Sequence, residues 1–98
     1  MVLFLRRSPK WGPLRASHLR LEGWCRFCGG LVRLQVHHII PVHVDPALEL
    51  DPANLITLCE NPGHNCHLLK GHLGDWSKWN PDIRALATIP DPNKKPAS

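Results

Sequence analysis

Four cysteines and seven histidines in only 98 residues are the feature that most limits what this sequence can fold into. A domain of this size buries little apolar surface, so a bound metal or a crosslink commonly reinforces its core. Residues 1–5 are apolar and precede Arg6 and Arg7, the reverse of the order in a secretory signal. In the reducing cytoplasm that this implies, cysteines hold metal more often than they form disulfides. The composition predicts a metal-supported cytoplasmic domain.

The cysteines fall into two pairs. Cys25-x-x-Cys28 is followed by two glycines, and such a tight turn presents two thiolates to one tetrahedral zinc ion. Six residues separate Cys59 from Cys66, and a Pro-Gly turn among them can bring the two together. A redox role for the first pair would need a βαβ context, which the sequence lacks. We therefore expect a structural zinc site on all four cysteines, with His64 as the alternative to Cys66.

The net charge of +4 is distributed unevenly along the chain. Residues 1–33 hold seven basic side chains and one acidic one, whereas residues 34–73 hold one lysine and four acidic residues. A basic N-terminal third fits a polyanionic partner, although a solvated basic face is the simpler explanation of such a run. The residues that precede the cysteine motif and are expected to contact phosphates are Arg6, Arg7, Lys10, Arg15 and Arg20.

Turn signals divide the chain into short elements. Residues 13–22 have near-helical apolar spacing after Pro13, and we expect Arg15 and Arg20 to be exposed there. Strands are predicted at 31–40 and 55–58, separated by a loop with two Asp-Pro turns. A helix is predicted at 64–73, ending at Gly74. Ten prolines and seven glycines exclude long helical bundles, and no apolar run is long enough for a membrane span.

We expect three regions: a basic segment at 1–12, one domain at 13–87, and a disordered Pro-containing tail at 88–98. The tryptophans Trp76 and Trp79 lie between the last predicted helix and this tail. They are expected to pack against the small core rather than to stack on bases, because few other aromatic residues are available to cover it.

A second group of polar residues accompanies the cysteines. His37 and His38 are neighbours on a predicted strand, so their side chains point to opposite faces. This arrangement suits one imidazole that binds a metal and another that faces a substrate water. Cys66 and His67 are likewise adjacent, and we expect Cys66 to point toward the other cysteines and His67 toward the other histidines. His72 lies five residues after His67, about 140° around an α-helix, which is a poor but possible position for a shared metal.

The ordered motifs resemble those of the HNH endonucleases. They are Cys25-x-x-Cys28, Val36-His37-His38-Ile39-Ile40-Pro41, Asp51-x-x-Asn54-Leu55-x-x-Leu58-Cys59 and Cys66-His67, and the resemblance covers roughly residues 11–86. It implies an α+β fold: a small ββα-metal (His-Me finger) domain with an N-terminal helix and a structural zinc site. The segment after His67, through Trp76 to Asn80-Pro81, is similar to a bacterial and phage-like branch of the family.

The resemblance also implies roles for individual residues. His38 corresponds to the general base, whose imidazole titrates near pH 6.5 when unperturbed. His37 and His67 correspond to ligands of a catalytic divalent ion, with His72 as a possible third. Asn54 corresponds to the residue that orients the base. His37 stands where Asp is commoner, which shifts metal preference from Mg toward Mn, Ni, Co or Zn.

The sequence thus predicts a metal-dependent DNA endonuclease of a bacterial or phage-like cytoplasm. Its catalytic residues would be His38, Asn54 and His67, its cofactors a structural zinc and a divalent Mg, Mn, Ni or Zn ion, and its partner DNA, with no membrane. The alternatives are a non-catalytic zinc-stabilised nucleic-acid-binding module and a protein-interaction module. A complete set of His37, His38, Asn54 and His67 favours the enzyme, because a pure binding module has no chemical use for it.

Overall fold

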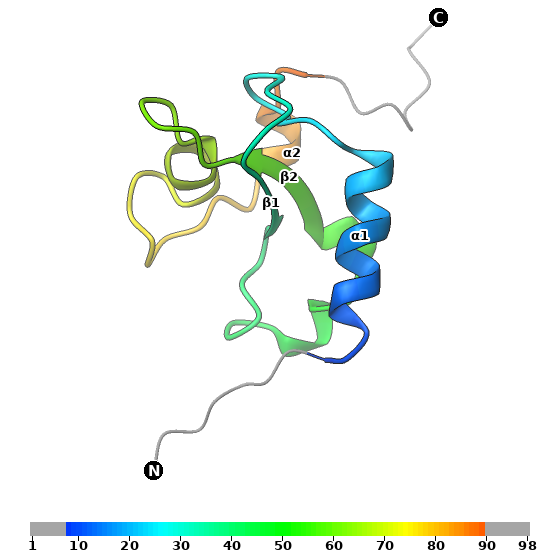
Figure 1. Ribbon diagram of the computed structural model, residues 1–98. Helices are drawn as coiled ribbons and strands as arrows, with labels where there is room; N and C mark the ends of the chain where they lie inside the picture. Colours follow the sequence, from blue (N-terminus) through cyan, green and yellow to red (C-terminus); the bar gives the residue numbers. More distant parts are fainter. Residues whose placement is uncertain (1–7, 90–98) are drawn as a thin grey trace, which may run out of the picture.

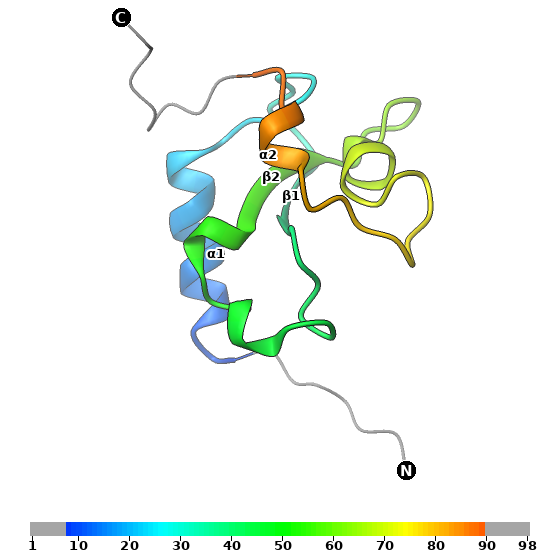
Figure 2. The same ribbon diagram turned by 180° about the vertical axis from the view of Figure 1, so that it is seen from behind.

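The structure, a computed structural model, describes residues 8–89. Its centre is a two-stranded antiparallel sheet with a helix on each side, as Figures 1 and 2 show from opposite directions. In chain order the elements are α1 (Trp11–Leu21), β1 (Leu34–His38), the 3-10 turns η1 (Pro46–Leu48) and η2 (Pro52–Asn54), β2 (Leu55–Cys59), the π-helix η3 (His67–Gly71) and α2 (Ile83–Leu86).

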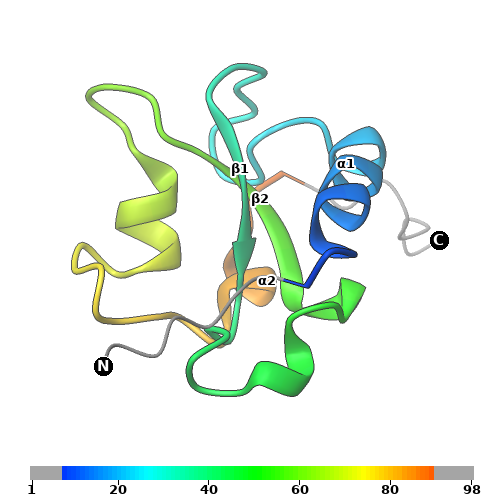
Figure 3. The ribbon, with the colours of Figure 1, turned by 60° about the horizontal axis from the view of Figure 1, so that its bottom comes forward.

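The sheet separates two layers of side chains. Leu34 lies opposite Cys59, and His38 lies opposite Leu55, at the two ends of the pairing. Directly opposed residues of an antiparallel pair point to the same face, and successive residues alternate between faces. One face therefore meets α1, and the other meets η3, which lies across the sheet from α1 in the tilted view of Figure 3.

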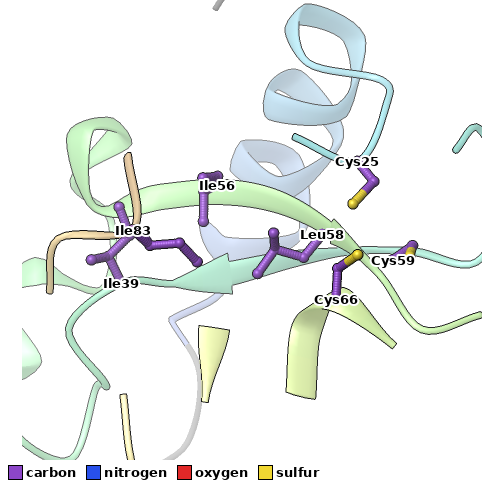
Figure 4. Packing of buried hydrophobic residues seen from close by; sticks show 7 residues of the cluster. All are labelled: Cys25, Ile39, Ile56, Leu58, Cys59, Cys66 and Ile83. Carbon is purple, nitrogen blue, oxygen red and sulfur yellow. The ribbon is translucent and has the colours of Figure 1, made fainter. Parts of the chain in front are cut away.

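The hydrophobic core is small and runs along the sheet. Ile39, Ile56, Leu58 and Ile83 pack together and are joined by three cysteines at one end of the strands (Figure 4). Ile83 comes from α2, so this short helix closes the core on the side of β2. The cysteine cluster therefore forms one end of the hydrophobic core.

A buried carboxylate attaches α1 to the sheet. Glu22, just after the helix, accepts hydrogen bonds from the backbone N–H of Thr57 at 2.8 Å and from Arg26 Nη1 at 3.1 Å. The Thr57 hydroxyl donates to the Glu22 carbonyl at 2.7 Å, and His18 Nε2 lies 3.5 Å from the carboxylate. Burial alone would raise the pKa of Glu22, but the bonds from His18 and Thr57, with the charge of Arg26, lower it overall.

The predicted elements are confirmed with altered ends. The first helix begins at Trp11 rather than Pro13, and the first strand occupies 34–38 rather than 31–40. The strand starts late because its partner ends at Cys59, and Arg33 just before it has a left-handed φ of 54°. Both Asp-Pro turns form as predicted: Asp45 and Asp51 accept bonds from backbone N–H groups two residues ahead.

The predicted helix at 64–73 differs most. It is a π-helix over His67–Gly71, and Gly74, with φ of 83°, ends the segment where a stop was expected. Thr88 and Ile89, within the predicted tail, are held by hydrogen bonds to Phe27 and Arg26. The rest of that tail, and Arg6 and Arg7, lie outside the described residues. Across residues 8–89, no helix has the length and apolar character that crossing a bilayer requires.

Glu22→Gln should lower the free energy of unfolding by about 3 kcal/mol at neutral pH, because it removes the carboxylate from a buried ion pair with Arg26. The folded pKa of Glu22 lies below its unfolded value, so the carboxylate stabilises the fold above the unfolded pKa of about 4.3. That contribution is lost as the pH falls through the folded pKa. Urea unfolding of both proteins at several pH values measures it: the difference between them should shrink in acid. A constant difference would contradict this assignment.

Candidate functional site

Four cysteine sulfurs form the first of two donor clusters. Cys25 and Cys28 come from the turn after α1, Cys59 ends β2, and Cys66 precedes η3, and their sulfurs all lie within 4.8 Å of one another. The sulfurs of Cys28 and Cys59 are 3.6 Å apart. Thiolates bound to one tetrahedral zinc at about 2.3 Å would be separated by about 3.8 Å. The geometry is therefore compatible with a structural zinc ion.

The ionisation of these thiols supports the same fit. Burial raises the pKa of Cys66 and of Cys28, and the neighbouring thiols raise them further. At Cys59 burial also acts upward, but backbone N–H groups of Asn61 and Cys66 outweigh it and lower the pKa to about 6. Several thiolates this close repel one another, and a divalent cation would compensate their charge. The donor set thus fits zinc better than four free thiols.

The turn at 61–64 brings the second pair together as the sequence predicted. Asn61 and His64 form an isolated bridge, and Gly63 adopts a left-handed φ of 84° that favours glycine. The side chain of His64 is exposed, and only its carbonyl approaches the cluster, accepting from the Cys59 thiol at 3.4 Å. The structure therefore brings Cys66, and not the alternative His64, into the cysteine cluster.

Cys66→Ser should lose the zinc and cooperative unfolding together, because structural zinc in small domains contributes on the order of 10 kcal/mol of apparent folding free energy. His64→Ala should keep both, since the exposed imidazole is outside the cluster. Elemental analysis and thermal unfolding of the two purified variants measure this. A serine variant with a full zinc, beside an alanine variant without zinc, would make His64 the fourth ligand.

Three histidines form the second cluster. His37 comes from β1, His67 begins η3, and His72 follows its end, with one ring nitrogen of each within 4.8 Å of the others. His37 Nδ1 lies 3.0 Å from His67 Nε2. Nitrogens bound to one metal at about 2.1 Å would be about 3.0–3.4 Å apart, depending on geometry. The three rings can therefore hold one divalent ion.

The π-helix explains how His72 joins this cluster. On an α-helix the five-residue spacing from His67 would place the two side chains about 140° apart. Here the His72 N–H donates to the His67 carbonyl at 3.1 Å, so a single wide turn spans the five residues. The poor but possible position expected for His72 assumed regular α-helical geometry, and the π-helical turn instead brings its ring into the cluster.

Gly71 allows η3 to approach the sheet. A Cβ at this position would lie 2.9 Å from Leu58 Cδ1 and 3.1 Å from His37 Nε2, so both side chains would have to shift. Glycine therefore lets the helix lie against β1 and β2 without displacing them. His37 Nε2 is buried at this contact and has no hydrogen-bond partner within residues 8–89. The nitrogen of His37 that faces the other rings is Nδ1.

Hydrogen bonds define which nitrogens of the other two rings carry lone pairs. His67 Nδ1 donates to the Glu60 carboxylate at 3.1 Å, and His72 Nδ1 donates to the Lys78 carbonyl at 2.7 Å. Both acceptors lack a proton to give, so in the neutral rings the Nε2 atoms hold the lone pairs. Metal-binding histidines commonly have an outer acceptor of this kind.

Burial keeps His37 and His67 in the neutral form that binds metal. Burial, reinforced by the nearby His67, His72 and His38, lowers the pKa of His37 to about 3. Burial also lowers the pKa of His67, although the bond to Glu60 acts in the opposite direction. Both imidazoles are thus available as metal ligands at neutral pH without losing a proton.

His38 faces α1, on the other side of the strand from His37. Its ring stacks on Trp11 with 4.5 Å between centroids, and its Nε2 donates to the Glu49 carbonyl at 2.9 Å. A carbonyl only accepts, so Nε2 carries the proton and Nδ1 carries the lone pair of the neutral ring. The predicted separation of the two histidines onto opposite faces is confirmed.

Asn54 fixes the loop that holds His38. Its Oδ1 accepts from the Ile40 N–H at 2.8 Å, and its Nδ2 donates to the carbonyls of Ile40 at 3.0 Å and Leu48 at 3.3 Å. Leu48 immediately precedes Glu49, the residue that accepts from His38. Asn54 is buried, so its amide ties β1, η1 and the start of β2 together directly beneath this imidazole.

A cavity of about 560 Å³ joins the two sides of the strand. His37 and His38 both line it although they project from opposite faces of β1, and His67 and His72 line it as well. The basic side chains on its wall are Arg15 and Lys78, and its aromatic side chains are Trp11, His43, Trp76 and Trp79.

Three of the basic residues predicted to contact phosphates are described by the structure, and they differ in their surroundings. Arg15 is half-buried on the cavity wall rather than exposed as expected, because its turn of α1 faces the end of β1. Lys10 and Arg20 are exposed and do not line the cavity, and Arg20 donates to Ser17 on its own helix. Of the three members of this group that the structure describes, Arg15 alone is placed beside the histidines.

Trp76 corrects another expectation. Its side chain is 53% exposed, so it does not cover the core, and its ring lies 5.2 Å from that of His67 and 4.9 Å from that of His72.

Glu60 and Lys78 were not predicted from the sequence, although both contact the histidines. Glu60 directly follows Cys59, and a carboxylate near a closing histidine was a signal that could have suggested it. Lys78 acts through its backbone, which no sequence pattern reveals.

A β-hairpin and a helix with metal donors between them define the ββα-metal class of small α+β domains. The chain belongs to the HNH endonuclease family, whose sequence profile matches residues 25–73, half of the chain. The matched stretch contains all four cysteines and the whole histidine triad. No curated protein and no solved structure matches the chain.

Proposed function

We propose that this HNH domain is a metal-dependent endonuclease that hydrolyses phosphodiester bonds of DNA. The observation that carries the proposal is the common cavity: three imidazoles placed to hold one divalent ion share it with a fourth, separately held imidazole, His38. A zinc-stabilised binding module would need the cysteine cluster but neither of these features.

His38 is the proposed general base. Its Nδ1 lone pair would take a proton from the attacking water, while Nε2 remains bonded to the Glu49 carbonyl. That carbonyl stabilises the imidazolium that forms, since both ring nitrogens are then donors. Stacking on Trp11 and the bonds of Asn54 keep the ring from turning away from the cavity.

The histidine triad is the proposed site of the catalytic ion. His37 Nδ1 and the Nε2 atoms of His67 and His72 would hold it, and a divalent ion there supplies Lewis-acid stabilisation of charge on the phosphate and the leaving oxygen. Three imidazoles favour Mn, Ni or Zn over Mg, which prefers oxygen ligands. Trp76 covers one side of the triad and limits the access of water.

His38→Ala should reduce cleavage by about 10²- to 10⁴-fold, because the water then lacks its base. Affinity for the catalytic ion should change little, since His38 is not among the proposed ligands. Nicking of supercoiled plasmid DNA with Mg²⁺, Mn²⁺, Ni²⁺ or Zn²⁺, with calorimetric metal titration beside it, measures both. His64→Ala is the matched control, because it removes an exposed imidazole outside the cavity.

Two results would overturn the assignment. If wild-type protein with any of these ions leaves the plasmid intact, the nuclease proposal fails and the binding module takes its place. If His38→Ala cannot bind the ion while His37→Ala can, the roles of the two neighbouring histidines are reversed.

Arg15 is proposed to hold a phosphate beside the reacting bond, because it is the one basic side chain of α1 on the cavity wall. Arg15→Gln should lower the slope of log affinity against log salt by about 0.9, the value for one contact to duplex DNA. Fluorescence anisotropy in the cleavage-deficient His38→Ala background, from about 50 to 200 mM salt, measures this slope.

Arg20→Gln, which removes the same charge from the exposed surface of the same helix, is the control and should leave the slope nearly unchanged. An equal decrease of the salt slope in the two variants would mean that α1 contributes only a diffuse basic surface. Arg15 would then make no specific contact with a phosphate.

A further inference from the structure

We propose that Glu60 is a positioning residue of the metal centre, which sets the tautomer and the orientation of His67. The inference rests on the proposed catalytic role of the triad but concerns a residue outside it. Glu60 contacts neither the lone-pair nitrogens nor the base, and it would act only through His67.

The contact geometry supports this role. Glu60 Oε2 accepts from His67 Nδ1 at 3.1 Å, and the same ring's Nε2 lies 3.0 Å from His37 Nδ1. The carboxylate, the His67 ring and the His37 ring are thus connected by two successive contacts, one on each nitrogen of His67. Without an acceptor at Nδ1, the neutral ring could place its proton on Nε2, where it would block the lone pair that the ion needs.

The surroundings of Glu60 argue against a purely structural role. Its side chain is 35% exposed and takes no part in the hydrophobic core. Its backbone N–H already bonds to the Arg33 carbonyl at 2.8 Å, and this bond does not depend on the side chain. Within residues 8–89, the contact with His67 is the one hydrogen bond that offsets the partial desolvation of this carboxylate.

A comparison of His67 with His72 shows why the acceptor of His67 is a side chain. His72 has a backbone acceptor, the Lys78 carbonyl, which the loop 75–78 provides through its own turn bonds. His67 begins its helix beside β2, and its ring turns toward the residue that follows the last pair of the two strands. Glu60 directly follows Cys59, so the strand that carries a cysteine of the first cluster also places the acceptor of the second.

The first experiment measures the tautomer of His67 by long-range ¹⁵N–¹H NMR, in protein with zinc on the cysteines and no ion at the triad. Wild-type protein and Glu60→Gln should show the proton on Nδ1, because a glutamine oxygen also accepts. Glu60→Ala should show a shift toward the Nε2–H form. A wild-type ring protonated on Nε2, or an unchanged tautomer in Glu60→Ala, would overturn the proposal.

The second experiment is a calorimetric titration of Ni²⁺ into the same zinc-loaded proteins. Glu60→Ala should bind about 10- to 100-fold more weakly, the usual effect of losing an outer acceptor, and Glu60→Gln should recover most of that loss. Asp82→Ala is the control for lost negative charge: its side chain is exposed and caps no helix, so its affinity should match wild type.

Equal weakening in Glu60→Gln and Glu60→Ala would mean that the carboxylate's charge or direct ligation matters, and positioning would be wrong. Zinc content and thermal unfolding of each variant show whether it is folded. Neither readout requires cleavage, so a protein that binds Ni²⁺ as expected but cuts no DNA would refute the nuclease proposal and leave the role of Glu60 intact.

Discussion

The pairing of β1 with β2 is the constraint on which the rest of this small protein depends. Alternation along β1 sends His37 toward η3 and His38 toward α1, so two neighbouring residues enter different environments. One ring meets two further imidazoles, and the other meets an aromatic face and a backbone carbonyl. A slip of one residue in the register would exchange the two histidines and lose both sites.

The two donor clusters are coupled because η3 takes part in both. Cys66 and His67 are consecutive, one turned toward the cysteines and the other toward the triad. The loss of the cysteine cluster would therefore release the start of η3, whereas Gly71 sets its distance from the sheet at the other end. A structural metal in such an arrangement would stabilise the fold and also hold a ligand of the second site in place.

On the opposite side of the sheet, α1 serves the site through buried polar contacts rather than a large apolar face. Glu22 fixes the end of the helix to β2, while Trp11 at its start lies against His38. Arg15, one turn after Trp11, reaches the cavity between these two attachments. The helix is thus anchored at both ends, which places one of its cations beside the histidines and leaves Arg20 in solvent.

The sequence by itself determined what is local or periodic. The Cys25-x-x-Cys28 turn, the Asp-Pro turns, the two strands, the opposite directions of His37 and His38, and the family follow from spacing, alternation and motif order. Only the tertiary structure decided that His72 joins the triad, that Glu60 and the Lys78 carbonyl orient its members, and that Arg15 alone of the basic residues described on α1 lines the cavity. The π-helical turn, the hydrogen bonds to His67 and His72, and the face of α1 that meets the cavity all depend on contacts between segments far apart in the sequence. Such contacts produce no periodic pattern in the sequence.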